Sequence, residues 1–321
     1  RVIPWSYGDI PPSYLLQNDG TGKFKDVTAN YSKDLQKAGF VTKALWVDMD
    51  GDKKKDLLVS CEWGTIDVYL NANGKLEKKI LCDKKGWWNT VLPFDADGDG
   101  DIDIIAGNLG LNTRLQASEK QPVRLYYNDF DDNGKKEQLL TYYVGNREIP
   151  FVGKSEMENQ MPGIKKQFFY AKDFAKATLG EIFGKDKLQE AQLLAANYFS
   201  HCLLINKGDL NFDIKPLPWE TQLSTVRDVM VINANDDNFP DVMLVGNYYQ
   251  NNVEMGRSDA GCGSILVNDR EGNFVNENIQ GAVVKGEARS VKRITIKGKD
   301  ACIVAKNNDT TMVLNRQGRK F

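Results

Sequence analysis

The most informative stretch of this sequence is Asp95-Ala-Asp97-Gly-Asp99-Gly-Asp101-Ile-Asp103, which carries five carboxylates in nine residues. One apolar run precedes it at 91–94 and another follows it at 104–107. Short apolar runs separated by Asp-Gly pairs are typical of two strands joined by a tight loop. The stretch therefore predicts a strand, an acidic loop and a second strand.

The same loop pattern occurs four times, with Asp or Asn at positions 1, 3 and 5 and an acidic residue at position 9. The other copies span 48–56, 129–137 and 233–241. On a tight loop, positions 1, 3 and 5 direct side-chain oxygens to one centre, position 7 adds a backbone carbonyl, and position 9 adds a carboxylate. Calcium binds six to eight oxygens at about 2.3–2.6 Å, so the pattern predicts calcium loops between strands.

The predicted ligands, at positions 1, 3, 5, 7 and 9 of each loop (position 7 through its backbone), are Asp48, Asp50, Asp52, Lys54 and Asp56; Asp95, Asp97, Asp99, Asp101 and Asp103; Asp129, Asp131, Asn133, Lys135 and Glu137; and Asn233, Asn235, Asp237, Phe239 and Asp241. The fourth loop has two neutral ligands and no Gly, so we expect it to bind weakly or to stay empty. We therefore expect two to four structural calcium ions. The alternative, four ordinary hairpin turns, does not explain one shared register.

A second signature, an apolar strand that ends in Asn before a Gly turn, recurs at 14–24, 68–74, 202–208, 265–272 and 312–318. The two signatures together give units of about four strands, which favours an all-β fold, a β-propeller of six or seven four-stranded blades. The expected units span 1–40 (incomplete), 41–82, 83–148, 191–220, 222–281 and 286–321. We expect one domain over 1–321.

Residues 152–197 interrupt the repeats and are expected to form a helical insertion between blades. Gly184 is expected to end one helix, and 187–195 to form a second short helix. An insertion of this length either caps one face of the propeller or shapes a binding surface.

Composition excludes several classes of protein. The net charge of −2 and the lack of a basic stripe argue against nucleic-acid binding, and no apolar run is long enough to span a membrane. The five cysteines show no CxxC spacing, so buried free thiols are expected rather than a disulfide framework. The chain begins at Arg1 without Met, and we expect it to be part of a longer polypeptide.

Catalytic signatures are scarce. The single histidine, His201, lies in an apolar run, so a structural role is expected, and neither a zinc site nor a Ser-His-Asp triad is supported. Trp87, Trp88, Tyr248 and Tyr249 are the candidate surface aromatics on which a sugar ring would stack. Packing in the core is nevertheless the favoured interpretation for each of them, because aromatic residues are common between the blades of propellers.

The loop Asp95–Asp103 followed by Ile104-Ile-Ala-Gly-Asn108 resembles the FG-GAP/VCBS repeat, which also forms the propellers of integrin α-subunits. Further stretches resemble large exported bacterial FG-GAP/VCBS proteins related to the cartilage acidic protein family. These stretches are Arg1-Val-Ile-Pro4, Ser13-Tyr-Leu-Leu-Gln-Asn-Asp-Gly20, Glu181-Ile-Phe-Gly184, Lys215-Pro-Leu-Pro218 and Val304-Ala-Lys-Asn-Asn-Asp309. The resemblance implies a propeller of a secreted or cell-surface protein that acts in binding or adhesion.

We therefore expect a non-catalytic, calcium-binding extracellular module that binds a glycan or a surface protein through a propeller face. One alternative is a calcium-assisted polysaccharide lyase, because some such enzymes resemble this chain in being calcium-rich propellers. Arg289, Lys292, Tyr248 and Tyr249 are available as a base for that reaction. A purely structural module of a longer surface protein is the other alternative.

Overall fold

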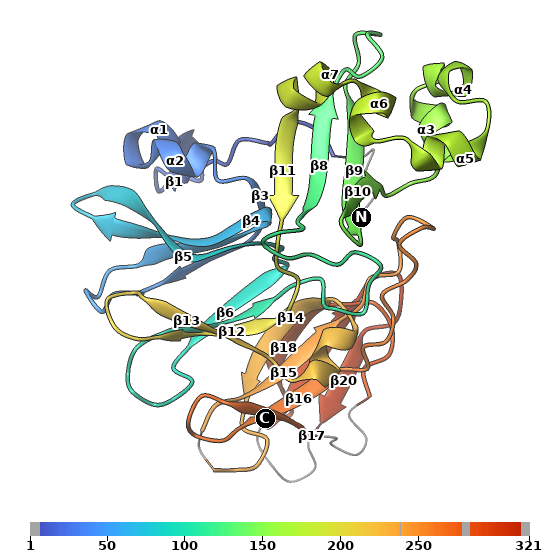
Figure 1. Cartoon of the computed structure of the whole chain (residues 1–321). Helices are drawn as coiled ribbons and strands as arrows, with labels where there is room; N and C mark the ends of the chain where they lie inside the picture. Colours follow the sequence, from blue (N-terminus) through green and yellow to red (C-terminus); the bar gives the residue numbers. More distant parts are fainter. Residues whose placement is uncertain (1–6, 238, 278–282, 316–321) are drawn as a thin grey trace. The chain divides into compact units, whose positions relative to one another are not determined.

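The computed structural model describes residues 7–237, 239–277 and 283–315. Within these residues the chain forms several β-sheets, none of which closes on itself (Figure 1). The stretch Arg1-Val-Ile-Pro4, one of those that resemble the exported bacterial proteins, lies outside the described residues. The end of the signature at 312–318 also lies outside them. None of the described helices is long and apolar enough to cross a lipid bilayer.

Contacts divide the chain into two compact units, described separately below. The main unit comprises Ile10–Asn112, Phe199–Tyr249 and the described residues from Arg257 onward. The smaller unit comprises Thr113–Tyr198, Gln250–Gly256 and residues 7–9. The expectation of one propeller domain over 1–321, with 152–197 inserted between blades, stays a prediction.

Three antiparallel sheets of the main unit are local in sequence, close to the units expected at 41–82, 222–281 and 286–321, although the first and third have three described strands instead of about four. Their strands are β3 (Phe40–Val47), β4 (Asp56–Ala72) and β5 (Lys75–Trp87); β14 (Val226–Ile232), β15 (Asp241–Gly246), β16 (Ser264–Asn268) and β17 (Phe274–Glu277); and β18 (Ala288–Ile296), β19 (Lys299–Lys306) and β20 (Met312–Asn315). The chain before them forms the hairpin of β1 (Leu16–Asn18) and β2 (Phe24–Asp26) and the helices α1 (Thr28–Tyr31) and α2 (Lys33–Gln36).

The fourth sheet of the main unit is not local in sequence. It has the order β13-β12-β7-β6, from β6 (Thr90–Phe94), β7 (Asp103–Gly107), β12 (Cys202–Asn206) and β13 (Phe212–Pro216). The expected units 83–148 and 191–220 are therefore wrong, because β12 pairs with β7 and places Cys202 opposite Ala106. Every residue of β12 is buried, so the strand needs a partner on each side, and sequence adjacency does not show which strand supplies it.

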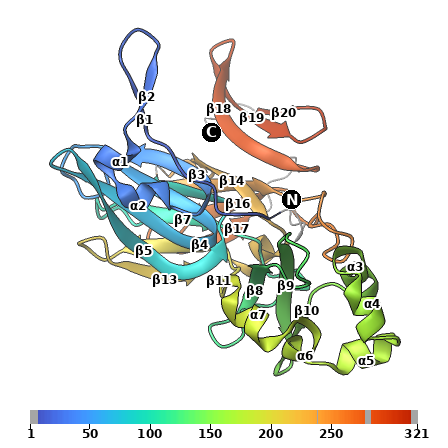
Figure 2. The ribbon, with the colours of Figure 1, turned by 90° about the horizontal axis from the view of Figure 1, so that it is seen from above.

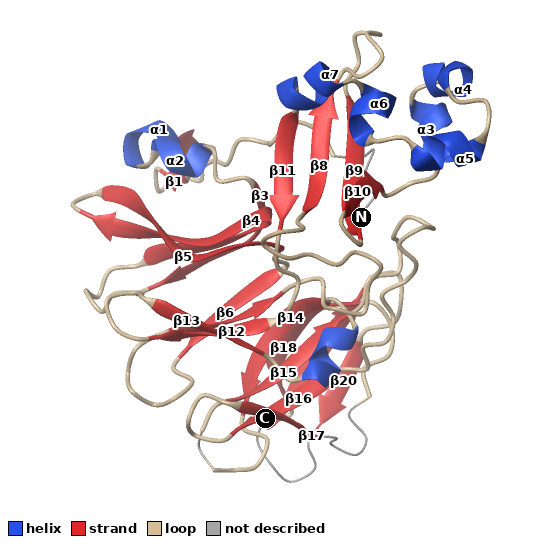
Figure 3. Cartoon of the chain, in the orientation of Figure 1, coloured by secondary structure: helices blue, strands red, loops and turns tan. Residues whose placement is uncertain are grey.

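The smaller unit contains a four-stranded sheet of its own, in the order β10-β9-β8-β11. Its strands are β8 (Val123–Asn128), β9 (Glu137–Val144), β10 (Arg147–Pro150) and β11 (Gln192–Ala196). Its helices are α3 (Lys154–Gln160), α4 (Gly163–Gln167), α5 (Ala171–Lys176), α6 (Leu179–Phe183) and α7 (Lys185–Glu190) (Figure 3). Helix α6 lies against β10 and α7 against β8, whereas α3 contacts α4 and α5 (Figure 2).

The helical expectation for 152–197 therefore needs one correction. Gly184, with a φ of +81°, follows α6 as expected. The second helix ends at Glu190, however, and β11 takes up Gln192–Ala196, where Leu194 lies opposite Leu125 of β8. Pairing with the sheet outweighs the weak helical pattern of this short apolar segment.

The core of the main unit lies between its sheets. Strand β6 neighbours β3 and β14, and β14 also neighbours β18. Ile105, Leu203 and Leu244, from three different strands, are at most 2% exposed and share one apolar cluster. Burying such side chains contributes roughly 1.5–3 kcal/mol each relative to exposure. All five cysteines are free thiols, and four of them are buried as expected, while Cys262 is exposed.

Candidate functional site

Each of the four acidic loops joins two neighbouring strands of one sheet, and its position 9 is the first residue of the second strand. That carboxylate accepts the backbone N–H of position 2, which closes the loop at its base. The donors and distances are Met49 to Asp56 (2.9 Å), Ala96 to Asp103 (2.8 Å), Phe130 to Glu137 (2.9 Å) and Ala234 to Asp241 (2.6 Å). The four carboxylates are between 0% and 6% exposed, so position 9 is a fixed part of the fold.

Within each loop the side chain at position 5 accepts the backbone N–H of position 7. The pairs are Asp52 with Lys54 (2.8 Å), Asp99 with Asp101 (2.9 Å), Asn133 with Lys135 (2.8 Å) and Asp237 with Phe239 (2.9 Å). Position 1 organises the turn as well: Asp95 accepts the N–H groups of Gly98 (2.7 Å) and Gly100 (3.1 Å). Both glycines have positive φ, +78° and +93°, a backbone conformation that glycine adopts without steric cost.

The second sequence signature meets these loops in space. The backbone N–H groups of Asn71, Asn206 and Asn268 donate to Asp56 (2.8 Å), Asp103 (2.8 Å) and Asp241 (2.9 Å). Each of these Asn side chains also donates to the carbonyl at position 8 of the same loop, in Lys55 (3.3 Å), Ile102 (3.4 Å) and Pro240 (3.2 Å). The sequence showed this Asn recurring before a Gly turn but not its contact with a loop.

Three of the loops bring carboxylate oxygens within 4.8 Å of one another. The groups are Asp48, Asp50 and Asp56; Asp95, Asp97 and Asp99; and Asp129, Asp131 and Glu137. Two oxygens bound to one calcium ion at about 2.3–2.6 Å lie at most about 5 Å apart, so this spacing fits a shared cation.

A second observation also points to a cation. The Oδ1 atoms of Asp97 and Asp131 are buried and have no hydrogen-bond partner. A buried carboxylate oxygen without a partner is unfavourable, and a bound cation would satisfy it. Both residues stand at position 3 of their loops, where the sequence predicts a ligand. The donor set consists of hard oxygen atoms, which suits calcium.

The electrostatics of the loops agree with this arrangement. Burial raises the pKa of Asp103, and the nearby charges of Asp97 and Asp99 add to that effect. Burial likewise raises the pKa of Asp56 and of Glu137. Several negative charges thus converge at each centre, and a bound cation would relieve their repulsion.

The fourth loop differs from the others. Arg270 forms an ion pair with Asp237 at 3.3 Å, and its guanidinium lies 5.1 Å from the centre of the Phe239 ring. Asn233 and Asn235 contribute no charge to this loop. A positive charge from the protein itself therefore stands at the loop for which the sequence predicted the weakest site.

Two of the four aromatic residues named as surface candidates lie in the core, where packing was the favoured interpretation. Trp87 is 2% exposed and Trp88 is 0% exposed, so the candidate sugar platform there is wrong and the core interpretation is confirmed. Trp87 packs against Trp63 at 5.0 Å and Phe199 at 5.1 Å between ring centres. Trp87 ends β5 and Trp88 follows it, so the alternation of a strand, which would turn one ring outward, does not extend to this pair.

In the other candidate pair, Tyr248 is buried and Tyr249 is half-buried. Tyr248 is 7% exposed and has the guanidinium groups of Arg227 and Arg289 at 5.4 Å and 5.2 Å from its ring centre. Tyr249 is half-buried, with Arg257 at 5.2 Å. These positions fit packing better than an open stacking platform.

The residues considered for catalysis are engaged in the fold. Arg289 pairs with Glu287 at 2.7 Å, and Lys292 pairs with the buried carboxylate of Asp228 at 3.1 Å. His201 is fully buried; its Nδ1 accepts the Asn108 N–H at 2.8 Å and its Nε2 lies 2.9 Å from the carbonyl oxygen of Ser224. Burial lowers the pKa of His201 to about 4. The histidine is therefore neutral at physiological pH and holds strands together.

Comparison with known families bears on the loops directly. No curated protein matches the chain. The model of the FG-GAP-like repeat matches residues 48–106, a stretch that begins at the first position of the first acidic loop and ends in the strand after the second. The resemblance noted in the sequence is thus confirmed for this part of the chain: residues 48–106 form an FG-GAP-like repeat.

Proposed function

We propose that this protein is a calcium-stabilised recognition module of the β-propeller type, which binds a glycan outside the cytoplasm and does not catalyse a reaction. The observation that supports it most strongly is the repetition of one loop geometry, with buried position-3 oxygens of Asp97 and Asp131 that have no hydrogen-bond partner. The FG-GAP-like repeat over residues 48–106 supports the propeller part of the proposal.

Calcium would act on structure in this proposal. Three loops would each hold one ion, and Arg270 would take the place of a strongly bound ion at the fourth. Because position 9 of each loop is buried at the start of a strand, an ion bound there would join two strands of a sheet. Ligands that bind only the folded state stabilise it, by about 2.7 kcal/mol per site at a concentration one hundred times the dissociation constant.

Recognition rather than catalysis is supported by the state of the reactive groups. Arg289 and Lys292, the candidate bases for a lyase, are each paired with a carboxylate, and His201 is buried. The location outside the cytoplasm, a place within a longer polypeptide and the kinship with exported cartilage acidic protein-related proteins belong to the same proposal. They rest on the resemblance described above.

Calcium binding is tested on protein treated with chelator and verified to be metal-free. Calorimetric titration with calcium should give three ions, one for each loop with a converging carboxylate group, and calcium should raise the melting temperature. Asp97→Asn should remove one binding event, whereas Asp83→Asn, a change at an exposed carboxylate outside the loops, should remove none. Identical melting of the metal-free and calcium-loaded proteins would overturn the calcium part of the proposal.

Recognition is tested with a panel of soluble polysaccharides, with and without calcium. Retention of the protein without new ultraviolet absorbance supports the proposal. Absorbance from unsaturated sugar ends would show a lyase instead. If no polysaccharide retains the protein, glycan recognition is wrong and a protein partner becomes the object of the search.

A further inference from the structure

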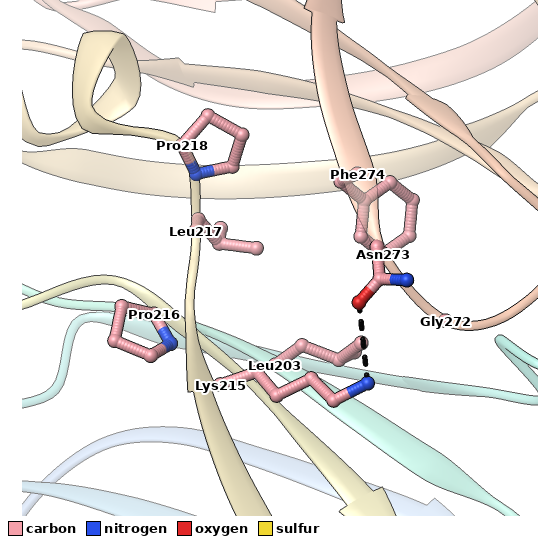
Figure 4. Close-up of a pocket in the computed structure, with 8 residues that line it drawn as sticks. All are labelled: Leu203, Lys215, Pro216, Leu217, Pro218, Gly272, Asn273 and Phe274. Atoms are coloured by element: carbon pink, nitrogen blue, oxygen red, sulfur yellow. Dashed lines mark hydrogen bonds between the residues drawn. The ribbon is translucent and has the colours of Figure 1, made fainter.

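A groove of about 200 Å³ lies in the main unit between the end of β13 and the hairpin of β16 and β17 (Figure 4). Residues 215–218 form one wall, residues 272–274 form the other, and Leu203 contributes an apolar side chain. Two prolines, Pro216 and Pro218, make the first wall stiff because their φ angles are fixed. One wall of the groove is therefore held in a fixed backbone conformation.

The groove combines apolar and polar groups. The ammonium of Lys215 donates to Oδ1 of Asn273 at 3.3 Å, as Figure 4 shows. The Asn273 side chain in turn donates to the carboxylate of Asp269 at 2.8 Å. An ammonium, a carboxamide and a carboxylate together offer both donors and acceptors. Sugar hydroxyls both donate and accept hydrogen bonds, so this set matches a glycan better than a purely apolar ligand.

An exposed tryptophan follows the first wall directly. Trp219 is 69% exposed, the highest value among the tryptophans that the structure describes. It opens the 3₁₀ helix η2 (Trp219–Leu223), which is fixed by two hydrogen bonds from Thr221 to the carbonyl of Pro218, at 3.0 Å and 2.7 Å. The side chain of Gln222 is buried and bonds the backbone of His201. These bonds fix the backbone that carries the indole, and an exposed indole is a suitable surface for the apolar face of a sugar ring.

We propose that this groove and Trp219 form the glycan-binding site, with a pyranose ring stacked on Trp219 and its hydroxyls bonded by Lys215 and Asn273. This inference rests on the proposed glycan recognition and assigns it to particular residues. None of these residues is a predicted metal ligand, and none was singled out as a binding residue from the sequence.

The hairpin wall of the groove also touches two acidic loops. Asn268, at the end of β16, donates from its side chain to the carbonyl of Ala96 in the second loop at 2.6 Å. A Cβ atom on Gly272 would lie 3.5 Å from the Cβ of Asp97, so the turn of the hairpin packs against a position-3 ligand. Arg270 of the same turn pairs with Asp237 of the fourth loop.

Because the hairpin packs on the second loop, an ion bound by Asp97 and its neighbours should hold the groove in its binding shape. Calcium should therefore raise the affinity for the glycan, and the glycan should raise the affinity of the second loop for calcium by the same factor. If the groove and the second loop were not coupled, neither ligand would change the affinity of the protein for the other.

The test uses affinity electrophoresis of the calcium-loaded protein in gels containing mannan, xylan, hydroxyethylcellulose or alginate, followed by calorimetry with the polysaccharide that retains it. Trp219→Ala and Asn273→Ala should each weaken binding, the first by about tenfold. Trp46→Ala is the matched control, because Trp46 is 51% exposed on β3, outside the groove. All variants should melt at the wild-type temperature, since the groove positions altered are exposed.

The outcomes separate the site from the function. Loss of binding in the Trp219 and Asn273 variants, with binding intact in the Trp46 variant, supports the inference. Wild-type affinity in both groove variants overturns this site and leaves glycan recognition standing. Failure of the wild-type protein to bind any of the four polysaccharides overturns both. Equal affinity with and without calcium refutes the coupling.

Discussion

The loop Asp95–Asp103 of the main unit and the loop Asp129–Glu137 of the smaller unit share one pattern but have different surroundings. In the first, both oxygens of the last carboxylate accept backbone N–H groups, from Ala96 within the loop and from Asn206 of another strand. In the second, Glu137 accepts one from Phe130. The loop of the main unit is thus tied to a neighbouring strand, while that of the smaller unit is closed mainly on itself.

The residues that hold each loop from outside also differ: a core residue holds the second loop, and a helix residue holds the third. Asn206 is 3% exposed and reaches the second loop from the core. The third loop is held from outside by Lys187 of α7, which donates to the carbonyl of Asp129 at 2.9 Å and forms an ion pair with Asp132. A buried amide and a half-buried ammonium paired with an exposed carboxylate depend differently on the salt concentration. The same sequence pattern therefore forms part of the core in the main unit and a loop held at the surface in the smaller unit.

The largest effect is expected for the last carboxylates. Asp103→Ala leaves two buried N–H donors without an acceptor, at a cost of about 1–3 kcal/mol each, whereas Glu137→Ala leaves one. Hydrogen exchange read by mass spectrometry at saturating calcium should show the main unit weakened by about twice as much free energy as the smaller unit in the respective variants. Asp83→Ala, at an exposed site, is the control. Equal losses for the two variants would contradict the difference drawn between the loops.

Acid should also act on the two units unequally, because the single histidine lies in the main unit. Burial lowers the pKa of His201 from 6.5 to about 4, so between these values the unfolded state binds a proton that the folded state does not. The stabilisation is complete above pH 6.5 and is lost as the pH falls toward 4, by roughly 3 kcal/mol in all.

Exchange measured at pH 7 and pH 5, with saturating calcium and correction for the intrinsic rate, should show this loss. The main unit should weaken, and His201→Gln should flatten its pH dependence even if the variant is less stable throughout. If the stability of the His201→Gln variant depends on pH as in the wild type, or if the smaller unit loses as much stability as the main unit, other groups cause the acid sensitivity.

These contrasts also show what the sequence could reveal. The loop positions were predictable because the spacing of Asp and Asn repeats in one register, and the strands beside them are short apolar runs. The pairing of β12 with β7 was not, because some ninety residues of another unit separate them and only burial on both sides selects the partner. The contact of Asn206 with the second loop could not be predicted for the same reason, because that loop lies far before Asn206 in the chain.

Aromatic residues illustrate the same limit. Trp87 and Trp88 stand out in the sequence as a pair, yet both are buried, whereas Trp219 stands alone among polar and proline residues and is exposed. Exposure depends on what the surrounding segments cover, and alternation within a strand predicts it only where the strand continues. The groove beside Trp219 joins two hairpins that are distant in sequence, so no local pattern marks it.

The smallest expected effect concerns the outer anchors. Asn206→Ala removes the side-chain bonds to Ile102 and to the N–H of Gly208, which should cost about 1 kcal/mol and speed exchange in the second loop and β12 at any salt concentration. Lys187→Ala removes an exposed ion pair, so its smaller effect should be confined to the third loop and should fade as salt is raised from 0.05 to about 0.5 M, where charges at a surface are screened. Calcium affinity should follow exchange in each case. If the Lys187 variant proves insensitive to salt, or if Asn206→Ala loosens the third loop as much as the second, the two loops are not anchored by the different means described.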